Sequence, residues 1–470
     1  MPFATTVSPA ARASLADARF VPFWLDRSDR PEPRAILSGD IEADLVVVGG
    51  GFSGLWTAYL ATERFPDWHV VLLEAGRLAD GASGRNGGFV SSSLTHGLPN
   101  GLARWPEELP ALLRLGAENL DEMERTIRAE DIDCDFFRSG ELDVAVEPYQ
   151  VREQQRMMAV AAQLGVDWEF VDAAGARSLV DSPTYLSGVV DRRGVALVDP
   201  ARLAWGLAAA CARRGVDIYE GTRAVDLSAE GPAMRVTADL GSVRAPRVAL
   251  ATSAYPPLLR RLGHYVVPVY DSVLVTEPLD ATRRETVGWA DRIGVADTGN
   301  QFHYYRMTED GRILWGGYDA SFHGGFDPAH ERYGAPFLRL AEHFRQTFPQ
   351  LSGTRFTHAW AGAIDTCSRF SAFWGLAHRG RVTYSVGFTG LGVGASRFGA
   401  EVMLDLLSGE QTERTALEMV RTKPLPFPPE PLRGFGIRVT RAALDRADRN
   451  EGHRNLWLRT LDRIGLGFDS

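Results

Sequence analysis

Lysine is almost absent from this 470-residue chain. Of its 51 basic residues only Lys423 is a lysine, and the other 50 are arginines. No Schiff-base lysine, phosphate-loop lysine or lysine general base is therefore available before Lys423. This excludes pyridoxal-phosphate enzymes and Walker-type nucleotide hydrolases.

Cysteine is scarce, and a long apolar run is missing. Cys134, Cys211 and Cys367 lie far apart and form no Cys-x-x-Cys pair, which favours a reducing compartment over a disulfide framework. The first 20 residues contain no apolar core of a secretory signal. No stretch approaches the ~20 apolar residues of a membrane span. We therefore expect a cytoplasmic protein with no membrane span.

Basic residues are also fewer than acidic residues. The chain has 60 acidic and 51 basic residues and a net charge of -9, the wrong sign for a dedicated nucleic-acid binder. We expect no nucleic-acid partner and no metal site. The length exceeds what one compact core usually spans, so at least two domains or one large composite fold are expected.

A strand-helix-strand pattern is the first strong feature that is present. Residues 44–48 and 70–73 read as buried strands, with a helix over 53–64 between them. Gly49-x-Gly51-x-x-Gly54 joins the first strand to the helix, as in loops that bind a pyrophosphate. Glu74 ends the second strand, where a carboxylate accepts hydrogen bonds from a ribose. The pattern predicts a dinucleotide site; the alternative is a plain glycine turn.

A second glycine-rich segment follows at residues 81–88, Gly-Ala-Ser-Gly-Arg-Asn-Gly-Gly. A nicotinamide nucleotide needs no second cradle, whereas an extended FAD passes a second backbone surface. The segment therefore favours FAD, with an ordinary surface loop as the alternative. Later, residues 265–318 show period-two alternation typical of an antiparallel sheet, and a proline-rich linker with a helical tail ends the chain.

Together with VVLLEAGR at residues 70–77 and YSVGFTGLGVG at 384–394, these segments resemble the D-amino-acid oxidase superfamily of flavoproteins over residues 40–410. The resemblance is strongest to its glycine oxidases, sarcosine oxidases and gamma-glutamylputrescine oxidoreductases. It implies an α/β fold with a Rossmann-like FAD-binding domain and a second antiparallel-sheet substrate domain. We assign residues 1–40 to an N-terminal arm, 41–100, 175–255 and 355–410 to the FAD-binding domain, 101–174 and 256–354 to the substrate domain with its helical insert, and 411–470 to the linker and tail.

The resemblance also implies the cofactor contacts. Residues 390–394 would face the flavin pyrimidine, Val225 the adenine, and Ala251-Thr252 the pyrophosphate. The early loop has no histidine and Cys367 comes too late for the family's cysteine linkage, so we predict non-covalent FAD. The predicted cofactor-binding residues are Gly49, Gly51, Phe52, Ser53, Gly54, Glu74, Ala75, Arg77, Ala82, Ser83, Arg85, Asn86, Gly87, Gly88, Val225, Ala251, Thr252, Gly362, Gly390, Leu391, Gly392, Val393 and Gly394.

Candidate reaction residues cluster in the strand over 302–306. His303 and Tyr305 point to one side of this strand, and Phe302, Tyr304 and Arg306 to the other. The sequence does not reveal which side sees the flavin, and His303 also fits a hydrogen-bonded structural histidine. The candidate catalytic residues are Arg85, Asn86, His303, Tyr305 and Arg306, and the candidate pocket residues are Phe89, Tyr304, Trp360 and Phe388.

The expected reaction is oxidation of the C–N bond of a primary or secondary amine by hydride transfer to flavin N5, giving an imine or aldehyde. A polyamine derivative, an N-alkyl amine or an omega-amino acid fits, because Gly394-Ala395 replaces the basic residue with which sarcosine oxidases hold a carboxylate. The reduced flavin would be reoxidised by O2 or another acceptor. Sarcosine oxidases activate O2 with a lysine over the flavin, and this chain has none there. Either Arg85, Arg306 or a histidine replaces that charge, or O2 is a poor acceptor. The alternatives are an FAD-dependent 2-hydroxy-acid dehydrogenase and a non-catalytic flavin-binding protein.

Overall fold

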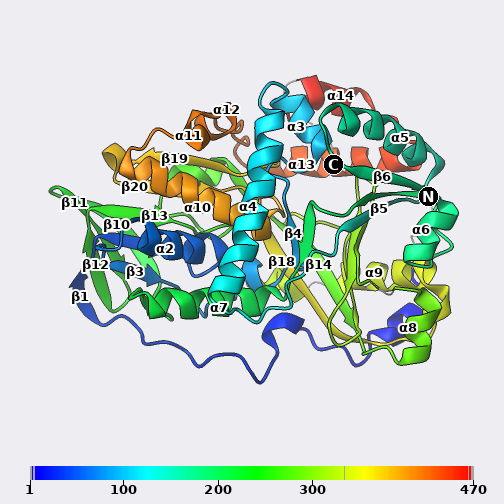
Figure 1. The fold of residues 1–470 in the computed structure, drawn as a ribbon, viewed down its shortest axis with the longest axis horizontal. Helices are drawn as coiled ribbons and strands as arrows, with labels where there is room; N and C mark the ends of the chain where they lie inside the picture. Colours follow the sequence, from blue (N-terminus) through cyan, green and yellow to red (C-terminus); the bar gives the residue numbers. More distant parts are fainter. Residues whose placement is uncertain (1–2, 4–5, 290, 333, 464, 467–470) are drawn as a thin grey trace.

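Two large β-sheets dominate the molecule (Figure 1). The structure is a computed structural model that describes the chain except residues 1–2, 4–5, 290, 333, 464 and 467–470. No helix in the described part is both long and apolar enough to cross a membrane.

The first large sheet has six strands and is mostly parallel. All four residues of β2 and of β3 are buried, as expected for strands covered on both faces. Only the pairing between β19 and β20 is antiparallel among its described pairs. Its strands in spatial order are β19 (Phe373–Ala377), β20 (Val382–Val386), β13 (Arg247–Leu250), β2 (Leu45–Val48), β3 (Val70–Leu73) and β9 (Asp217–Tyr219).

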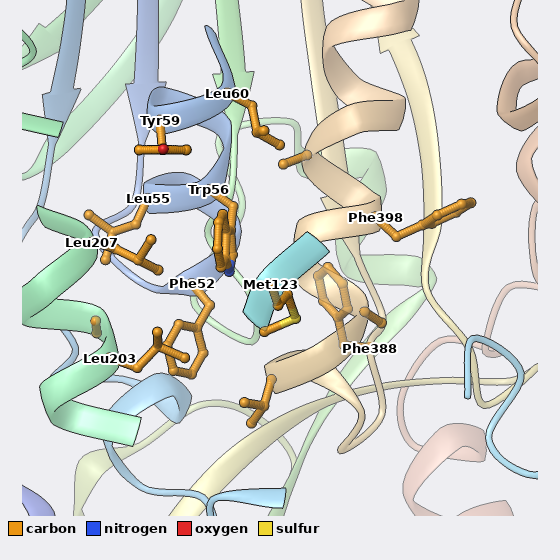
Figure 2. Close-up of a cluster of buried hydrophobic side chains, with 14 of the residues drawn as sticks. Phe52, Leu55, Trp56, Tyr59, Leu60, Met123, Leu203, Leu207, Phe388 and Phe398 are labelled. Atoms are coloured by element: carbon orange, nitrogen blue, oxygen red, sulfur yellow. The ribbon is translucent and has the colours of Figure 1, made fainter. Parts of the chain in front are cut away.

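Helix α2 (Phe52–Arg64) lies at the centre of the core beside this sheet. Figure 2 shows its side chains between Leu203 and Leu207 of α7 (Pro200–Arg213) on one side and Met123 of α4 (Leu109–Ala129) and Phe398 of α10 (Gly392–Ser408) on the other. These contacts fix the start of α2 relative to β2. Asp199 caps α7 by accepting from the backbone N–H groups of Ala201 and Arg202, as its Asp-Pro start predicts.

The second large sheet has eight strands and is antiparallel except where β15 pairs with β5. One face holds Trp360, Val273 and Tyr304 in the core shared with α2, and the other holds Tyr305 and Trp315 in a core with α9 (Gly334–Thr347). In spatial order its strands are β18 (Phe356–Cys367), β14 (Val266–Thr276), β17 (Ile313–Gly317), β16 (His303–Met307), β15 (Gly294–Asp297), β5 (Glu141–Ala145), β7 (Ser187–Asp191) and β6 (Trp168–Asp172).

Smaller elements surround the two sheets. A four-stranded sheet contains β1 (Gly39–Glu42), β12 (Gly241–Ala245), β11 (Ala233–Ala238) and β10 (Ala224–Glu230), and β4 (Phe89–Ser91) pairs with β8 (Val195–Leu197). The remaining helices are α1 (Pro9–Ser14), α3 (Leu98–Arg104), α5 (Pro148–Gln163), α6 (Ala173–Leu179), α8 (Ala281–Val287), α11 (Glu413–Ala416), α12 (Glu418–Arg421), α13 (Leu432–Arg449) and α14 (Leu456–Arg463).

The sheets do not follow the residue ranges that the sequence suggested for the two domains. Strands β7 and β18 fall within ranges assigned to the FAD-binding domain, but they pair in the eight-stranded sheet. The reason is that strand pairing joins segments that are distant in sequence, which a linear division cannot represent. The N-terminal arm lies on the body, with Trp24 buried and its indole N–H donating to the carbonyl oxygen of Asn86 at 2.9 Å.

Candidate active site

A cavity of about 2260 Å³ lies between the two large sheets. The loops after β2, β3 and β20 form part of its wall, strands of the eight-stranded sheet form another part, and α13 and α14 contribute a third.

The first glycine loop forms one wall of the cavity. Gly49 has φ of +116°, and a Cβ there would collide with the carbonyl oxygen of Ala251. A Cβ on Gly51 would lie 2.8 Å from Oγ of Ser83. Helix α2 then begins at Phe52, whose N–H donates to Oγ of Ser83 at 2.9 Å. The N-cap residue Gly51 has no side chain to cap the next N–H groups of the first turn, which remain available to an anion.

Two further features at the helix starts suit an extended anionic ligand. The hydroxyl of Ser53 is buried without a hydrogen-bond partner although Ser53 lines the cavity. Helix α10 also begins without a side-chain cap, at Gly392. Gly390 precedes it with φ of +93° and no atom within 4 Å of its missing Cβ. Two helix N-termini therefore offer backbone donors to the same cavity.

Glu74 supplies the carboxylate that the sequence predicts for a ribose. Its Oε2 accepts from the backbone N–H of Gly50 at 2.6 Å, and its Oε1 accepts from that of Gly76 at 2.8 Å. Burial raises the pKa of this carboxyl. A carboxylate has about four acceptor positions, so both oxygens can still accept from ligand hydroxyls.

Most predicted cofactor contacts line the cavity. They are Gly49, Gly51, Phe52, Ser53, Glu74, Ala75, Ala82, Ser83, Arg85, Asn86, Gly87, Val225, Ala251, Thr252, Gly362, Gly390, Leu391, Gly392 and Val393. Gly54, Arg77, Gly88 and Gly394 lie behind the wall. Gly54 packs on the carbonyl of Gly49 and Gly394 on that of Ser91, so neither position has space for a side chain. Arg77 pairs with Glu220 at 3.2 Å.

Arg85 and Asn86 are both committed to contacts within the protein. Nη1 of Arg85 pairs with Oε2 of Glu331 at 2.8 Å, and its Nε donates to the carbonyl of Asp80 at 2.6 Å. Asn86 donates from Nδ2 to the carbonyl of Ser83 at 2.8 Å. These bonds shape the second glycine-rich loop, and the positive charge of Arg85 is balanced by a carboxylate.

The structure resolves which side of β16 faces the cavity. Tyr304 lines it, whereas His303 and Tyr305 are buried on the opposite face. Nδ1 of His303 lies 2.6 Å from Oδ2 of Asp297, and Tyr305 shares a 2.7 Å hydrogen bond with the hydroxyl of Tyr185. Neither side chain lines the cavity, because alternate strand residues point to opposite faces, although Asp297, the partner of His303, does line it.

Arg306 is on the same face as Tyr304 but lies behind the cavity wall. It is fully buried, and its Nη1 donates to the carbonyl oxygens of Val198 at 2.7 Å and Gly88 at 3.2 Å. Burial lowers the pKa of its guanidinium to about 10. Its contacts are those of a residue that holds the second glycine-rich loop against the sheet.

Three of the four predicted pocket residues line the cavity: Phe89, Tyr304 and Phe388. The rings of Phe89 and Tyr304 meet edge to face with centroids 5.9 Å apart. Trp360 is buried behind the wall, where its indole N–H donates to the carbonyl oxygen of Arg85 at 2.9 Å.

Carboxylates on the same sheet face were missed by the sequence reasoning. Asp271 accepts from the hydroxyl of Tyr304 at 2.6 Å, and burial raises its pKa to about 6. Strand register places Tyr304 opposite Ala296, and Ala296 opposite Asp143, so Asp143 projects from the same face two strands away. Glu141 is two residues earlier on β5. All three carboxylates line the cavity.

The site as a whole defines a class of protein. Backbone donors at two helix N-termini, a partnerless hydroxyl and a buried carboxylate fit a dinucleotide, and the cavity is large enough to admit a small substrate beside it. This combination is that of a dinucleotide-dependent oxidoreductase. The family model described as "FAD dependent oxidoreductase", of the DAO family, matches residues 44–406. The chain belongs to this family, and FAD is its cofactor.

Individual relatives agree with the family. The chain is 30% identical over 414 residues to gamma-glutamylputrescine oxidoreductase of Escherichia coli (strain K12), covering 86% of this chain and 92% of the relative. It is 28% identical to probable oxidoreductase OrdL of Rhizobium meliloti (strain 1021), covering 83% and 89%. Glycine oxidase from Geobacillus kaustophilus has the same fold, with a TM-score of 0.69, 19% identity and coverage of 82% and 100%.

Proposed function

We propose that this FAD-dependent oxidoreductase oxidises the C–N bond of a primary or secondary amine, such as a polyamine derivative, an N-alkyl amine or an omega-amino acid. The observation that carries the proposal is the set of carboxylates on the cavity face, Asp271, Asp143 and Glu141. Asp271, with a pKa of about 6, is ionised at neutral pH, and Asp143 adds a second negative charge above about pH 7. These charges attract an ammonium group and repel the carboxylate of a 2-hydroxy acid. The similarity to an oxidoreductase named for an amine, gamma-glutamylputrescine, supports the same class.

FAD, when bound, supplies the acceptor for the two electrons that leave the substrate C–H bond. The residues of the chain bind the amine, orient it and manage its proton. Asp271 is the strongest candidate for this role, because a carboxyl with a pKa of about 6 accepts a proton from an ammonium group more readily than an ordinary aspartate. The hydroxyl of Tyr304 fixes the carboxylate in place. Loss of two electrons and two protons leaves an imine, which water hydrolyses to a carbonyl compound.

A small α-amino acid held by its carboxylate is disfavoured by the same geometry. Arg85 is already paired with Glu331, and the closely packed Gly394 has no room for a basic side chain. The amine group, rather than a neighbouring carboxylate, is therefore the part of the substrate that this wall binds.

FAD is bound without a covalent link in this proposal. Cys367 is fully buried, its Sγ lies 3.1 Å from the carbonyl oxygen of Ser371, and it does not line the cavity. Burial raises the pKa of its thiol, which keeps the sulfur protonated. Cys134 and Cys211 are also buried away from the cavity.

Anaerobic flavin bleaching tests the function. Holoenzyme is mixed with primary amines, N-methylamines, 1,4-diaminobutane, 4-aminobutanoate and 2-hydroxy acids, and the visible flavin absorbance is followed. We expect amines to bleach the flavin and to release one equivalent of ammonia or alkylamine per flavin. Bleaching by hydroxy acids alone, or by none of these compounds, contradicts the proposal. Repeating the reaction in air with a peroxide assay identifies whether O2 is the acceptor.

A further inference from the structure

The C-terminal segment forms part of the cavity wall although it follows the residues that the family model matches. The match to the family ends at residue 406, whereas residues between 426 and 466 also line the cavity. Leu432, Phe435 and Ile437 of α13 and Trp457 of α14 all line the cavity. In Figure 1 these helices lie at the same side of the molecule as α3 and α5. The tail is therefore built into the site.

Two anchors hold α13 on the eight-stranded sheet. The carboxylate of Asp448 accepts from Nδ2 of Asn300 at 2.6 Å and from the backbone N–H groups of Asn300 at 3.1 Å and Gln301 at 3.2 Å. Arg441 forms an ion pair with the buried Asp319. Asn300 and Gln301 lie between β15 and β16, and Asp319 closely follows β17. The anchors thus attach to loops at one end of these strands.

That end of the sheet is close to the proposed amine contact. Tyr304 is the second residue of β16 and pairs with Gly316, the last residue but one of β17. Because a strand advances about 3.3 Å per residue, the anchoring loops begin on the order of 10 Å from Tyr304 and its partner Asp271. Asp271 and residues of α13 line the same cavity, so a molecule held by Asp271 has a continuous space toward this end of the strands.

The tail presents apolar side chains to this space. Leu432, Phe435 and Trp457 line the cavity with exposed fractions of 62%, 59% and 38%. The indole N–H of Trp457 donates to Oγ1 of Thr440 at 3.0 Å, which ties the ring to α13. Covering such apolar surface with an alkyl or aryl group removes it from water and favours binding.

The arginines of this segment that line the cavity, Arg433, Arg441 and Arg454, are each paired with a carboxylate. Arg433 pairs with Glu430 at 2.9 Å, Arg441 with Asp319, and Arg454 with Asp462 at 3.0 Å. Their charges are balanced locally. The cavity therefore combines carboxylates on the sheet with an apolar wall on the tail.

We propose that the C-terminal segment is the subsite for the non-reacting end of the substrate and selects amines that carry an extended alkyl or aryl group. The inference rests on the proposed function, because the amine end is assigned to Asp271. Trp457 and Phe435 determine specificity in this arrangement. Asp448 is a positioning residue, because it acts through the placement of α13.

Trp457→Ala tests the apolar wall, with Leu456→Ala as the matched control. Leu456 is its neighbour on α14, is 78% exposed and is not a wall residue. Flavin reduction is measured anaerobically with n-octylamine, n-propylamine and 1,4-diaminobutane. We expect the unmodified enzyme to prefer n-octylamine. Trp457→Ala should lower kcat/KM for n-octylamine roughly ten-fold through KM, with n-propylamine unchanged, and Leu456→Ala should change neither.

Several outcomes would contradict the proposed subsite. Equal losses for the short and long amines would mean that Trp457 only supports the fold, and identical behaviour of Trp457→Ala and Leu456→Ala would remove the tail from the site. A preference of the unmodified enzyme for 1,4-diaminobutane would also overturn the apolar subsite. If Trp457→Ala does not fold, Phe435→Ala takes its place in the same comparison.

Hydrogen exchange supplies a readout that does not depend on turnover. Asp448→Asn should speed amide exchange at Asn300 and Gln301 roughly ten-fold, whereas Asp445→Asn, on the same helix and paired with Arg449, should not. n-Octylamine should slow exchange in α13 of the unmodified holoenzyme. Unchanged exchange in both tests overturns the tail subsite. Failure of every amine to bleach the flavin instead overturns the proposed function, so the two failures are distinguishable.

Discussion

At the scale of single residues, Asp271 is the group on which the proposed chemistry depends most. It is buried, accepts a 2.6 Å hydrogen bond from Tyr304 and faces the cavity. Burial is the main reason that its pKa is raised to about 6, and the Tyr304 hydroxyl opposes this shift because it stabilises the ionised form. Removing the carboxylate and removing the hydroxyl should therefore change the pH profile of kcat/KM in different ways, and each change can be measured separately.

Substituting Asp271→Asn should remove the acidic limb of the pH profile. In the unmodified enzyme, kcat/KM for an amine should fall below about pH 6, because protonation of Asp271 removes the negative charge that attracts the ammonium group. The variant should lose kcat/KM roughly 100-fold at pH 8 and show no such limb. A variant with the unmodified limb near pH 6 would assign that titration to another group.

Tyr304→Phe provides the paired control at this site. The tyrosine hydroxyl holds the ionised form of Asp271, so its removal should move the acidic limb to a pH above 6. The flavin content should stay unchanged, because the hydroxyl contacts a wall carboxylate. A limb that stays at the same pH would separate Tyr304 from the titration of Asp271.

The same pair of residues shows why part of the site could not be read from the sequence. Asp271 is one acid within an apolar strand, and nothing in its neighbours marks it as functional. Its role can be inferred only from the strand register, which places β14 and β16 on either side of β17. Register likewise decides that Tyr304 faces the cavity and His303 does not. Local patterns could state the two-fold alternation of β16, but not its orientation.

At the scale of elements, the unit formed by β2, α2 and β3 was predicted closely because its signals are local. The predicted helix over 53–64 is α2, which begins one residue earlier. Its apolar strands, glycine spacing and terminal Glu74 all act within a short stretch of chain. The position of α13 has no such local signal, since Asp448 reaches Asn300 across a large separation in sequence.

Gly54→Ala should break this unit. A methyl group at Gly54 would collide with the carbonyl oxygen of Gly49, so α2 must move away from β2 and its first turn must leave the cavity wall. We expect purified Gly54→Ala to retain less than about a tenth of its FAD, or to be insoluble.

Gly76→Ala is the matched control, because its added Cβ would lie 3.6 Å from Oδ2 of Asp80, an ordinary contact, and its φ is not in the left-handed region. It should keep its flavin and its melting temperature. Flavin content per protein, read from the visible spectrum, compares the two variants directly. Full flavin content in Gly54→Ala would show that the close approach of helix and strand is not needed for the cofactor.

At the scale of the whole molecule, carboxylates gathered on one internal face impose a cost on the folded chain. Burial, together with the charge of Asp191, raises the pKa of Asp143 to about 7, and burial also raises that of Glu141. A carboxyl whose pKa is higher in the folded state holds its proton more tightly there. The free energy of unfolding therefore falls as the pH rises from about 4 to about 7, and the cost persists above pH 7.

Asp143→Asn should remove the part of this penalty that comes from Asp143. Each pKa unit corresponds to about 1.4 kcal/mol, and water in the cavity reduces the full effect, so we expect on the order of 2 kcal/mol at pH 8. The melting temperature of the holoenzyme without amine should rise roughly 2–4 °C at pH 8 and stay nearly unchanged at pH 4. Asp133→Asn, at a carboxylate whose side chain is 91% exposed, should show no such pH dependence.

A cationic ligand should have the same effect as the substitution, because an ammonium group on this face balances the carboxylates. A non-reducing quaternary alkylammonium salt should therefore raise the melting temperature of the unmodified holoenzyme more at pH 8 than at pH 5. It should do so less in Asp143→Asn, since one of the charges that attracts it is gone. An equal rise at both pH values would mean that apolar contact alone binds the ligand, and the carboxylates would lose their role in selecting amines.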